Sequence, residues 1–372
     1  MKRLVFVVTH GITANLLLRG QLSFLRESGF DVTVIASPGP DLDAVRTREK
    51  ITTVGISMTR DVRLQEGPRA LAEMARAIHR IKPDIVNAST SKAGLLGMLA
   101  SYGVRVPKRI YLIRGLRFEG YTGAKRLALA QAERVTAACA TDVVCVSNSV
   151  RDIVVRDGLA ASRKTHVIPS NGIDPARFRP RSETRADALR IRRELGIPDD
   201  AFVAGFVGRL VADKGVDDML EALKRVPNAW FLVVGGNIAD DHLPEQTADR
   251  LRKRAHVVQV GRVAEPAPYY AAMDLLLFAS YREGLPNVPL EAAACELPVV
   301  GYRVTGVVDA VEDGVTGMLV PQKDTGALGA AISRYVGHPT LRATHGSAGR
   351  SRVLEQFTQL ATWKAWEALY RA

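Results

Sequence analysis

The stretch Ser280-Tyr-Arg-Glu-Gly-Leu-Pro-Asn-Val-Pro-Leu-Glu291 decides the fold of the second half of this sequence. The apolar segment from Met273 to Ala279 that precedes it is typical of a buried strand, and the run from Leu290 to Glu296 that follows favours a helix. The carboxylates Glu283 and Glu291 therefore lie where a strand passes into a helix.

Such a junction suits a ligand that carries both negative charge and hydroxyl groups. The first N–H groups of a helix have no intrahelical partner and lie at the positive end of its dipole, so they favour an anion. Carboxylates accept hydrogen bonds from hydroxyls. The pattern therefore indicates a phosphate flanked by polyols, as in a nucleotide-sugar.

A second stretch, Gly208-Arg-Leu-Val-Ala-Asp-Lys-Gly215, follows another strand-like segment. Glycine lets the backbone approach a ligand closely, and the cations Arg209 and Lys214 are suited to bracket a diphosphate. The alternative is that they form surface ion pairs with neighbours such as Asp213 or Asp217. Their place on a glycine turn after a strand favours the diphosphate.

Apolar strands alternate with longer helical patterns in both halves of the chain, which predicts parallel, doubly wound α/β sheets. In the first half we expect strands at residues 4–9, 31–37, 84–88, 109–113 and 142–146, and a helix at 69–82. In the second half we expect strands at 202–207, 230–234, 256–260, 275–278, 299–302 and 317–320. His10, Ser89, Arg114 and Ser147 each follow a strand, where ligand groups gather.

A break rich in turn formers runs from Asn171 to Pro180, and a polar, charged run continues to Asp200. We interpret this region as the link between two domains. The prediction is an N-terminal domain at 1–173 and a C-terminal domain at 174–354, with the helix at 355–372 returning to the first domain.

Composition narrows the class of protein further. In the 372 residues no apolar run approaches the roughly 18 residues of a membrane span, and the three cysteines lie in apolar segments, so a reduced cytoplasmic protein is expected. The acidic pair in Asp41-Leu-Asp43 follows Pro38-Gly-Pro40 and is expected to serve a turn rather than a metal.

Charge is distributed unevenly between the halves. Residues 1–173 hold 26 Lys and Arg against 14 Asp and Glu, a net charge of +12, whereas residues 174–372 hold 25 of each kind. A basic half suits nucleic acid, an anionic membrane or a polyanionic substrate, or it simply aids solubility. No nucleic-acid motif accompanies the basic residues, so nucleic acid is the weakest of these partners.

The two glycine-containing loops together resemble those of the retaining glycosyltransferases of family four. Further stretches support the resemblance: Ser170-Asn-Gly-Ile-Asp174, Val304-Thr-Gly-Val307 and Glu312-Asp-Gly-Val-Thr-Gly317. The N-terminal half is most similar to the exopolysaccharide and capsule transferases, through Leu18–Leu25, Ser91–Gly97 and Arg114–Gly120. The resemblance implies the GT-B fold, in which two Rossmann-like domains face each other across a cleft.

The resemblance also implies roles for residues that bind the donor. Catalysis is expected of Glu283, Arg209 and Lys214. The other donor-binding residues are expected to be Gly11, Gly208, Arg262, Gly284, Leu285, Pro286, Asn287, Glu291, Thr305 and Gly306. In this scheme Glu283 holds the sugar hydroxyls and Glu291 the ribose hydroxyls, while backbone N–H groups from Gly284 to Asn287 face the phosphates.

Acceptor binding is expected of His10, Lys92, Arg114 and Arg117. The alternatives are a structural histidine and ordinary surface charge. No metal or other cofactor is expected, because Arg209 and Lys214 would neutralise the diphosphate.

The implied reaction moves a hexose or N-acetylhexosamine from a UDP-linked donor to a lipid-diphosphate-linked saccharide, at the cytoplasmic leaflet of an anionic membrane. A transferase for a soluble sugar is one alternative. A nucleotide-sugar epimerase on the same fold is another, and it would need further carboxylates and histidines at the site. A nucleic-acid-binding protein would rest on charge alone.

Overall fold

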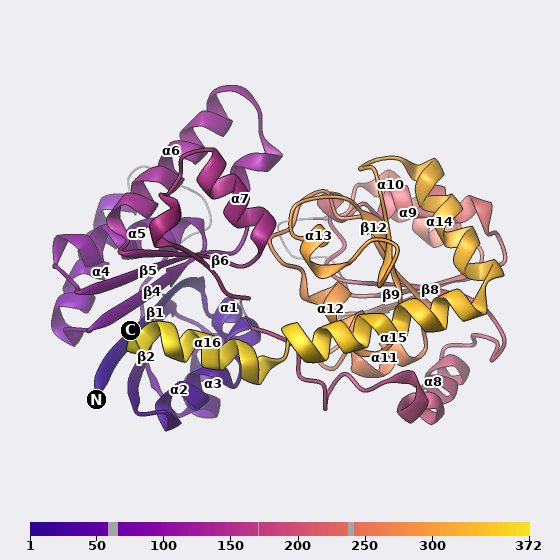
Figure 1. The fold of residues 1–372 in the computed structure, drawn as a ribbon, viewed down its shortest axis with the longest axis horizontal. Helices are drawn as coiled ribbons and strands as arrows, with labels where there is room; N and C mark the ends of the chain where they lie inside the picture. Colours follow the sequence, from indigo (N-terminus) through magenta and orange to yellow (C-terminus); the bar gives the residue numbers. More distant parts are fainter. Residues whose placement is uncertain (59–65, 170, 237–241) are drawn as a thin grey trace. The chain divides into compact units, whose positions relative to one another are not determined.

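A computed structural model describes residues 1–58, 66–169, 171–236 and 242–372. The chain forms two compact units (Figure 1): a first unit of Met1–Asn171 with Leu360–Ala372, and a second unit of Gly172–Gln359. The sequence placed these divisions at 173/174 and 354/355. Ser170, part of the expected link, lies outside the described residues.

The first unit contains a seven-stranded parallel sheet in the order β3-β2-β1-β4-β5-β6-β7. Its strands are β1 (Lys2–His10), β2 (Phe30–Ser37), β3 (Thr52–Gly55), β4 (Ile85–Ser89), β5 (Lys108–Ile113), β6 (Asp142–Cys145) and β7 (Thr165–Val167). The central strands are buried apolar runs, as in β1, where residues 4–8 are at most 3% exposed. Burial on both faces is what a parallel sheet covered by helices requires.

Helices follow the strands of this sheet. They are α1 (Gly11–Leu17), α2 (Gln21–Glu27), α3 (Pro40–Glu49), α4 (Glu66–Ile81), α5 (Ser91–Gly103), α6 (Gly123–Cys139) and α7 (Asn148–Arg156), with 3₁₀ turns η1 (Arg117–Gly120) and η2 (Ser162–Lys164). The last helix of the chain, α16 (Gln359–Arg371), buries Trp366 and Tyr370 in this unit. Trp366 donates to the carbonyl of Pro169 at 3.1 Å, which fixes the helix to the end of the first half.

The second unit contains a six-stranded parallel sheet in the order β10-β9-β8-β11-β12-β13. Its strands are β8 (Val203–Val207), β9 (Trp230–Val234), β10 (Val257–Gly261), β11 (Leu275–Phe278), β12 (Val299–Tyr302) and β13 (Gly317–Val320). Its helices are α8 (Arg181–Glu194), α9 (Val216–Ala222), α10 (Glu245–Lys253), α11 (Ala267–Ala271), α12 (Asn287–Ala294), α13 (Val307–Ala310), α14 (Thr325–Gly337) and α15 (Pro339–Gln356), with 3₁₀ turns η3 (Ala212–Lys214) and η4 (Leu223–Arg225).

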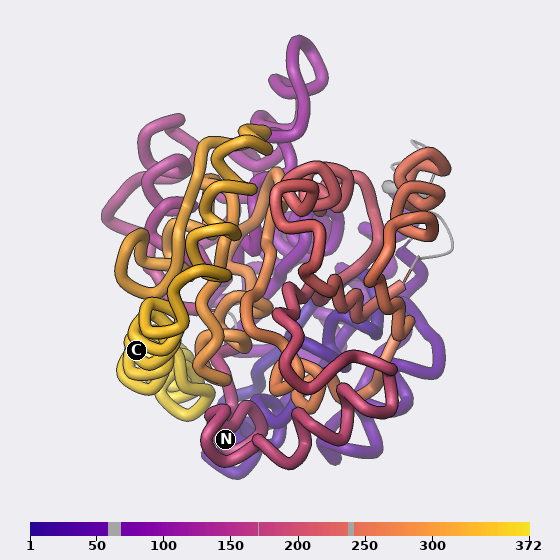
Figure 2. The backbone as a smooth tube through the Cα atoms, turned by 90° about the vertical axis from the view of Figure 1, so that its right-hand side faces the viewer, coloured from indigo at the N-terminus to yellow at the C-terminus, as the bar shows by residue number. Residues whose placement is uncertain are grey.

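Two apolar cores lie against this second sheet. One includes Phe178, Tyr270 and Leu290, and the other Phe206, Phe231 and Tyr302. Figure 2 follows α14 and α15, drawn in orange and yellow, along one side of the unit. The predicted doubly wound α/β architecture is confirmed for both units.

The polar run that the sequence suggested as part of a link is instead helix α8, which packs on α11. Its Arg192 is 5% exposed and donates to Asp274 at 2.8 Å and to the carbonyl of Ala272 at 3.0 Å. A helix that is fixed by a buried ion pair and few apolar residues has a weak periodic signal. That is why the prediction was wrong here.

Three smaller corrections concern the first unit. Strands β3 and β7 were missed, because they are short edge strands with partly exposed residues. The pair Asp41 and Asp43 lies in the first turn of α3 rather than in a free turn, and Asp41 accepts a hydrogen bond from Asn15 at 2.7 Å. Acidic side chains are favourable at a helix N-terminus.

Candidate functional site

Three loops at one edge of the second sheet hold most of the predicted donor residues. They follow β8 (residues 208–215), β11 (279–286) and β12 (303–306), and these strands are adjacent in the sheet. Because the strands are parallel, their carboxyl ends meet at one edge. The fold thus brings together segments that are far apart in the sequence.

Glycine backbone contacts hold these loops close together. Gly215 has φ +66°, and a Cβ on it would lie 2.1 Å from the carbonyl oxygen of Ala279. Gly306 has φ +75°, and a Cβ on it would lie 2.1 Å from the carbonyl oxygen of Gly284. Both positions therefore require glycine, for conformation and for space.

Lys214 and Glu283, two of the predicted catalytic residues, contact each other directly. Lys214 Nζ lies 2.5 Å from Glu283 Oε1, and the two side chains are only 16% and 15% exposed. The ammonium also lies 5.8 Å from the centre of the Phe278 ring. Asp217, one of the neighbours that the sequence offered as an alternative partner, accepts from Arg250 of α10.

This arrangement places an ammonium and a carboxylate side by side at the sheet edge. The ammonium is suited to an anionic oxygen and the carboxylate to a hydroxyl. Arg209, the other predicted catalytic cation, is half-buried in the same loop, directly after Gly208. Arg262 is exposed at the end of β10, two strands away from β8.

Helix α12 begins at Asn287 beside this pair. The side chain of its N-cap residue, Pro286, makes no capping hydrogen bond to the first N–H groups of the helix. The predicted row of N–H donors from Gly284 to Asn287 is interrupted, because proline has no N–H. Leu285 and Asn287 supply such groups, and Thr305 and Gly306 lie in the neighbouring loop after β12.

Glu291 lies one turn further along α12 and is half-buried. Its Oε2 accepts a hydrogen bond from the hydroxyl of Tyr270 at 2.7 Å. Burial raises the pKa of Glu291 above its usual value, although the Tyr270 hydrogen bond and the charge of Arg177 act in the opposite direction. Sequence reasoning missed Tyr270, which is fully buried and gives no signal that it reaches a carboxylate 21 residues away.

The predicted acceptor residues lie in the first unit, mostly at the carboxyl edge of its sheet. His10 ends β1 and caps α1, Lys92 is the second residue of α5, and Arg114 follows β5. Thr9 and Thr90 link the ends of β1 and β4 through a hydroxyl pair at 2.7 Å.

Arg114 is the most enclosed of the predicted acceptor cations. Its Nε donates to Ser89 Oγ at 3.3 Å, and burial lowers the pKa of Arg114 to about 10. Arg117 lies three residues further along, exposed, at the start of η1. Gly11 is buried in α1, where a Cβ would lie 2.7 Å from the backbone nitrogen of Leu42, so close packing on α3 accounts for this glycine within the unit.

A buried polar pair beneath this edge was not predicted. The amide of Asn87 in β4 donates to the hydroxyl of Tyr370 in α16 at 2.6 Å. A polar residue inside an apolar strand signals that a partner is needed. The sequence does not reveal that the partner comes from the last helix.

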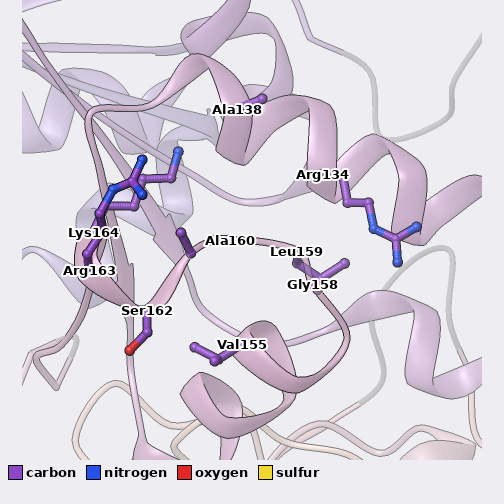
Figure 3. A pocket seen from close by; sticks show the side chains of 10 residues that line it. Arg134, Ala138, Val155, Gly158, Leu159, Ala160, Ser162, Arg163 and Lys164 are labelled. Carbon is purple, nitrogen blue, oxygen red and sulfur yellow. The ribbon is translucent and has the colours of Figure 1, made fainter.

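A cavity of about 630 Å³ lies elsewhere in the first unit (Figure 3). Arg163 and Lys164 stand on one side of it and Arg134 on the other. Because this lining comes from the ends of α6 and α7 and from the residues just before β7, the cavity lies at the opposite edge of the sheet from His10 and Arg114. None of the predicted site residues lines it.

The part of the chain that the structure describes holds neither a cluster of metal ligands nor a membrane-spanning helix. Among residues 1–58, 66–169, 171–236 and 242–372, no group of three or more His, Cys, Asp or Glu side chains is placed to hold a metal ion. Within the same ranges no helix is both long and apolar enough to span a membrane.

Family models match both halves of the chain. A model for glycosyl transferases group 1 matches residues 201–338, and a model for a glycosyl transferase 4-like domain matches residues 17–171. The first match contains all three donor loops.

Individual relatives extend these matches over nearly the whole chain. The capsular polysaccharide biosynthesis glycosyltransferase CapM of Staphylococcus aureus is 34% identical over 362 residues, which cover 95% of this chain and 93% of that protein. The UDP-Gal:alpha-D-GlcNAc-diphosphoundecaprenol alpha-1,3-galactosyltransferase of Escherichia coli is 27% identical over 84% of this chain and 82% of that protein.

Solved structures share the fold. HepE of Anabaena, in complex with UDP and glucose, superposes with a TM-score of 0.83 at 21% identity, over the whole of both chains. Sucrose-phosphate synthase of Thermosynechococcus elongatus gives the same TM-score at 21% identity, over all of this chain and 98% of that one.

Proposed function

Because the chain belongs to the family-four glycosyltransferases of the capsule type, which have the GT-B fold, we propose that it moves a hexose or N-acetylhexosamine from a UDP-linked donor to a polyprenyl-diphosphate-linked saccharide. The observation that carries the proposal is the Lys214–Glu283 pair within three joined loops at the sheet edge. The two relatives named above, one in capsule synthesis and one with a diphosphoundecaprenol-linked acceptor, support the choice of acceptor.

In this proposal the second unit binds the donor. Arg209, Lys214 and the N-terminus of α12 face the diphosphate, since all three favour negative charge. Glu283 accepts hydrogen bonds from the sugar hydroxyls and Glu291 from those of the ribose. Gly208, Arg262 and the Thr305–Gly306 loop complete the site, where they present backbone groups to the donor.

The proposed chemistry retains the anomeric configuration. The bond from the anomeric carbon to the diphosphate oxygen breaks, and a bond to the acceptor oxygen forms on the same face. The acceptor proton passes to the departing diphosphate. The side chains Arg209 and Lys214 stabilise the charge that develops on that leaving group, which is why the proposal includes no metal.

The first unit is proposed to meet the acceptor and an anionic membrane surface on the cytoplasmic side. Its helix α6 leaves Leu127 70% exposed and Val135 40% exposed, and Lys125 and Arg134 of the same helix are exposed as well. The one acidic residue of α6, Glu133, is buried and accepts a hydrogen bond from Tyr111. The exposed side chains of α6 therefore include both apolar and basic ones, which suits anionic lipid headgroups.

Two other functions remain as rivals with distinct outcomes. A transferase for a soluble sugar would need no membrane, and the basic first half would then serve solubility. An epimerase on the same fold would convert the donor without any acceptor, by acid–base elimination.

A donor screen tests the proposal. The purified protein is incubated with UDP-, GDP- and ADP-sugars, with and without a polyprenyl-diphosphate saccharide, and products are followed by chromatography and NMR. The expected result is an α-linked product from an α-linked UDP-sugar, formed only with the lipid-linked acceptor. Turnover with a soluble sugar alone, or a new nucleotide-sugar epimer without acceptor, would favour one of the rivals.

A further inference from the structure

A carboxylate outside the predicted site joins the same three loops. Asp218 is the third residue of α9, four residues after Lys214. Its Oδ2 accepts two hydrogen bonds, one from the hydroxyl of Tyr281 at 2.9 Å and one from the hydroxyl of Tyr302 at 2.8 Å. The two rings are stacked, with centres 6.2 Å apart and planes 13° apart.

Each tyrosine belongs to a different donor loop. Tyr281 lies two residues before Glu283, in the loop after β11. Tyr302 ends β12, three residues before Thr305. Asp218 itself belongs to the helix that directly follows the loop with Lys214. One carboxylate oxygen therefore connects the three segments that carry the proposed donor contacts.

Further contacts fix Tyr281 in place. Its backbone N–H donates to the carbonyl of Asp213 at 2.9 Å, and its own carbonyl accepts from Gln322 at 3.0 Å. The ammonium of Lys323 lies 5.5 Å from the ring centre. Burial, followed by the hydrogen bond to Asp218, raises the pKa of both tyrosines, so both hydroxyls remain protonated donors at neutral pH.

We propose that Asp218 is a positioning residue of the donor site. It holds Tyr281 and Tyr302, and thereby keeps Lys214, Glu283 and the Thr305–Gly306 loop in their positions relative to one another. This inference rests on the proposed function for the roles of those residues. Asp218 acts through the two tyrosines and is not a group that meets the reacting atoms. Its removal leaves the hydroxyl of the buried Tyr302 without this acceptor and takes from the loop with Tyr281 the contact that joins it to Tyr302.

Asp217 provides a matched control on the same helix. It also accepts two side-chain hydrogen bonds, from Thr247 at 3.2 Å and from Arg250 at 2.5 Å, but these partners lie on α10. Asp217→Ala therefore removes a comparable number of contacts from α9 without loosening the donor loops.

The first test is kinetic. Since a misplacement of roughly 1 Å can lower turnover about 100-fold, Asp218→Ala should lower kcat on that scale, whereas Asp217→Ala should not. Asp218→Asn keeps an oxygen acceptor and should recover most of the rate. In a Glu283→Gln background the further loss from Asp218→Ala should shrink to less than about 3-fold, because the two residues act together. Independent, multiplying losses would overturn the proposal, as would equal losses in the two alanine variants.

The second test needs no substrate. Hydrogen exchange of backbone amides should speed up in Asp218→Ala for peptides that cover 280–286 and 303–306, and remain at the wild-type rate there in Asp217→Ala. Unchanged exchange in both loops would overturn the positioning role. A wild-type protein that transfers no sugar would instead defeat the proposed function, and the exchange experiment would still decide the role of Asp218.

Discussion

The carboxyl edges of the two sheets are built differently. In the second unit the loops are joined by backbone contacts at Gly215 and Gly306 and by the ion pair between Lys214 and Glu283. In the first unit the corresponding edge carries cations on separate segments, and Arg114 bonds Ser89 at 3.3 Å. Residues 1–173 also carry all of the excess charge. The proposed function accounts for this difference, since it assigns the donor to the second unit and an anionic acceptor to the first.

The largest expected effect concerns the cations in the joined loops of the second unit. Arg209→Ala and Lys214→Ala should each remove about 2–4 kcal/mol of transition-state stabilisation, because each deletes a charge that is proposed to face the leaving diphosphate. Steady-state kinetics on folded variants measure it, with circular dichroism as the check on folding. Lys224→Ala is the matched control, since its exposed side chain pairs with Glu221 on the helical surface. Near wild-type turnover in both site variants would show that neither Arg209 nor Lys214 takes part in catalysis.

The next prediction separates the two carboxylates of the donor site. Glu283→Gln should lower kcat most, because Glu283 is assigned to the reacting sugar. Glu291→Gln should weaken binding of donor and of free UDP alike, by about 1.5–3 kcal/mol for a lost hydrogen bond to a charged group. Titration calorimetry with UDP distinguishes the two. Equal losses of UDP affinity in both variants would show that the roles are wrongly divided.

The amount of this fold that could be predicted depends on how each element is stabilised. Strands β9, β11, β12 and β13 were predicted with the bounds that the structure shows, because buried apolar runs between turn residues leave a clear pattern. Helix α8 was not, because its burial depends on the pair of Arg192 with Asp274, 82 residues away.

The same limit applies to the site. Residue types and their order indicated Lys214 and Glu283 separately, and their separation of 69 residues concealed the contact. Tyr270 and Asp218 left no local signal, since both act on partners that only the fold brings near. Sequence therefore predicts which residues stand after strands, but not which of them pair.

A third prediction probes the first unit through its buried polar pair. Tyr370→Phe removes the hydroxyl that meets Asn87 at 2.6 Å and leaves a buried amide unsatisfied, which should cost about 1–3 kcal/mol of unfolding free energy. Thermal or urea unfolding measures the change. Tyr370→Phe with Asn87→Leu should recover part of the loss, because both partners are then apolar. Full stability of the single variant would show that the pair contributes nothing.

The smallest effect per residue concerns the surface of the first unit. If the exposed side chains of α6 meet anionic lipid, each basic residue near the surface should contribute about 1 kcal/mol. The protein should sediment with vesicles that contain anionic lipid and not with neutral ones. Lys125→Glu with Arg134→Glu should weaken this binding, while Lys253→Glu, an exposed change on the second unit, should not.

Salt provides the independent check on the same contact. Binding should fall as ionic strength rises, since the Debye length shortens from about 10 Å at 0.1 M to about 3 Å at 1 M. Leu127→Ser should lower the part of the binding that persists in high salt, because Leu127 is 70% exposed and would insert among the headgroups. Equal binding to anionic and neutral vesicles, or none to either, would leave the basic face as a solubility feature. The contrast between the two units would then lie in the donor loops alone, and a soluble acceptor would become the better proposal.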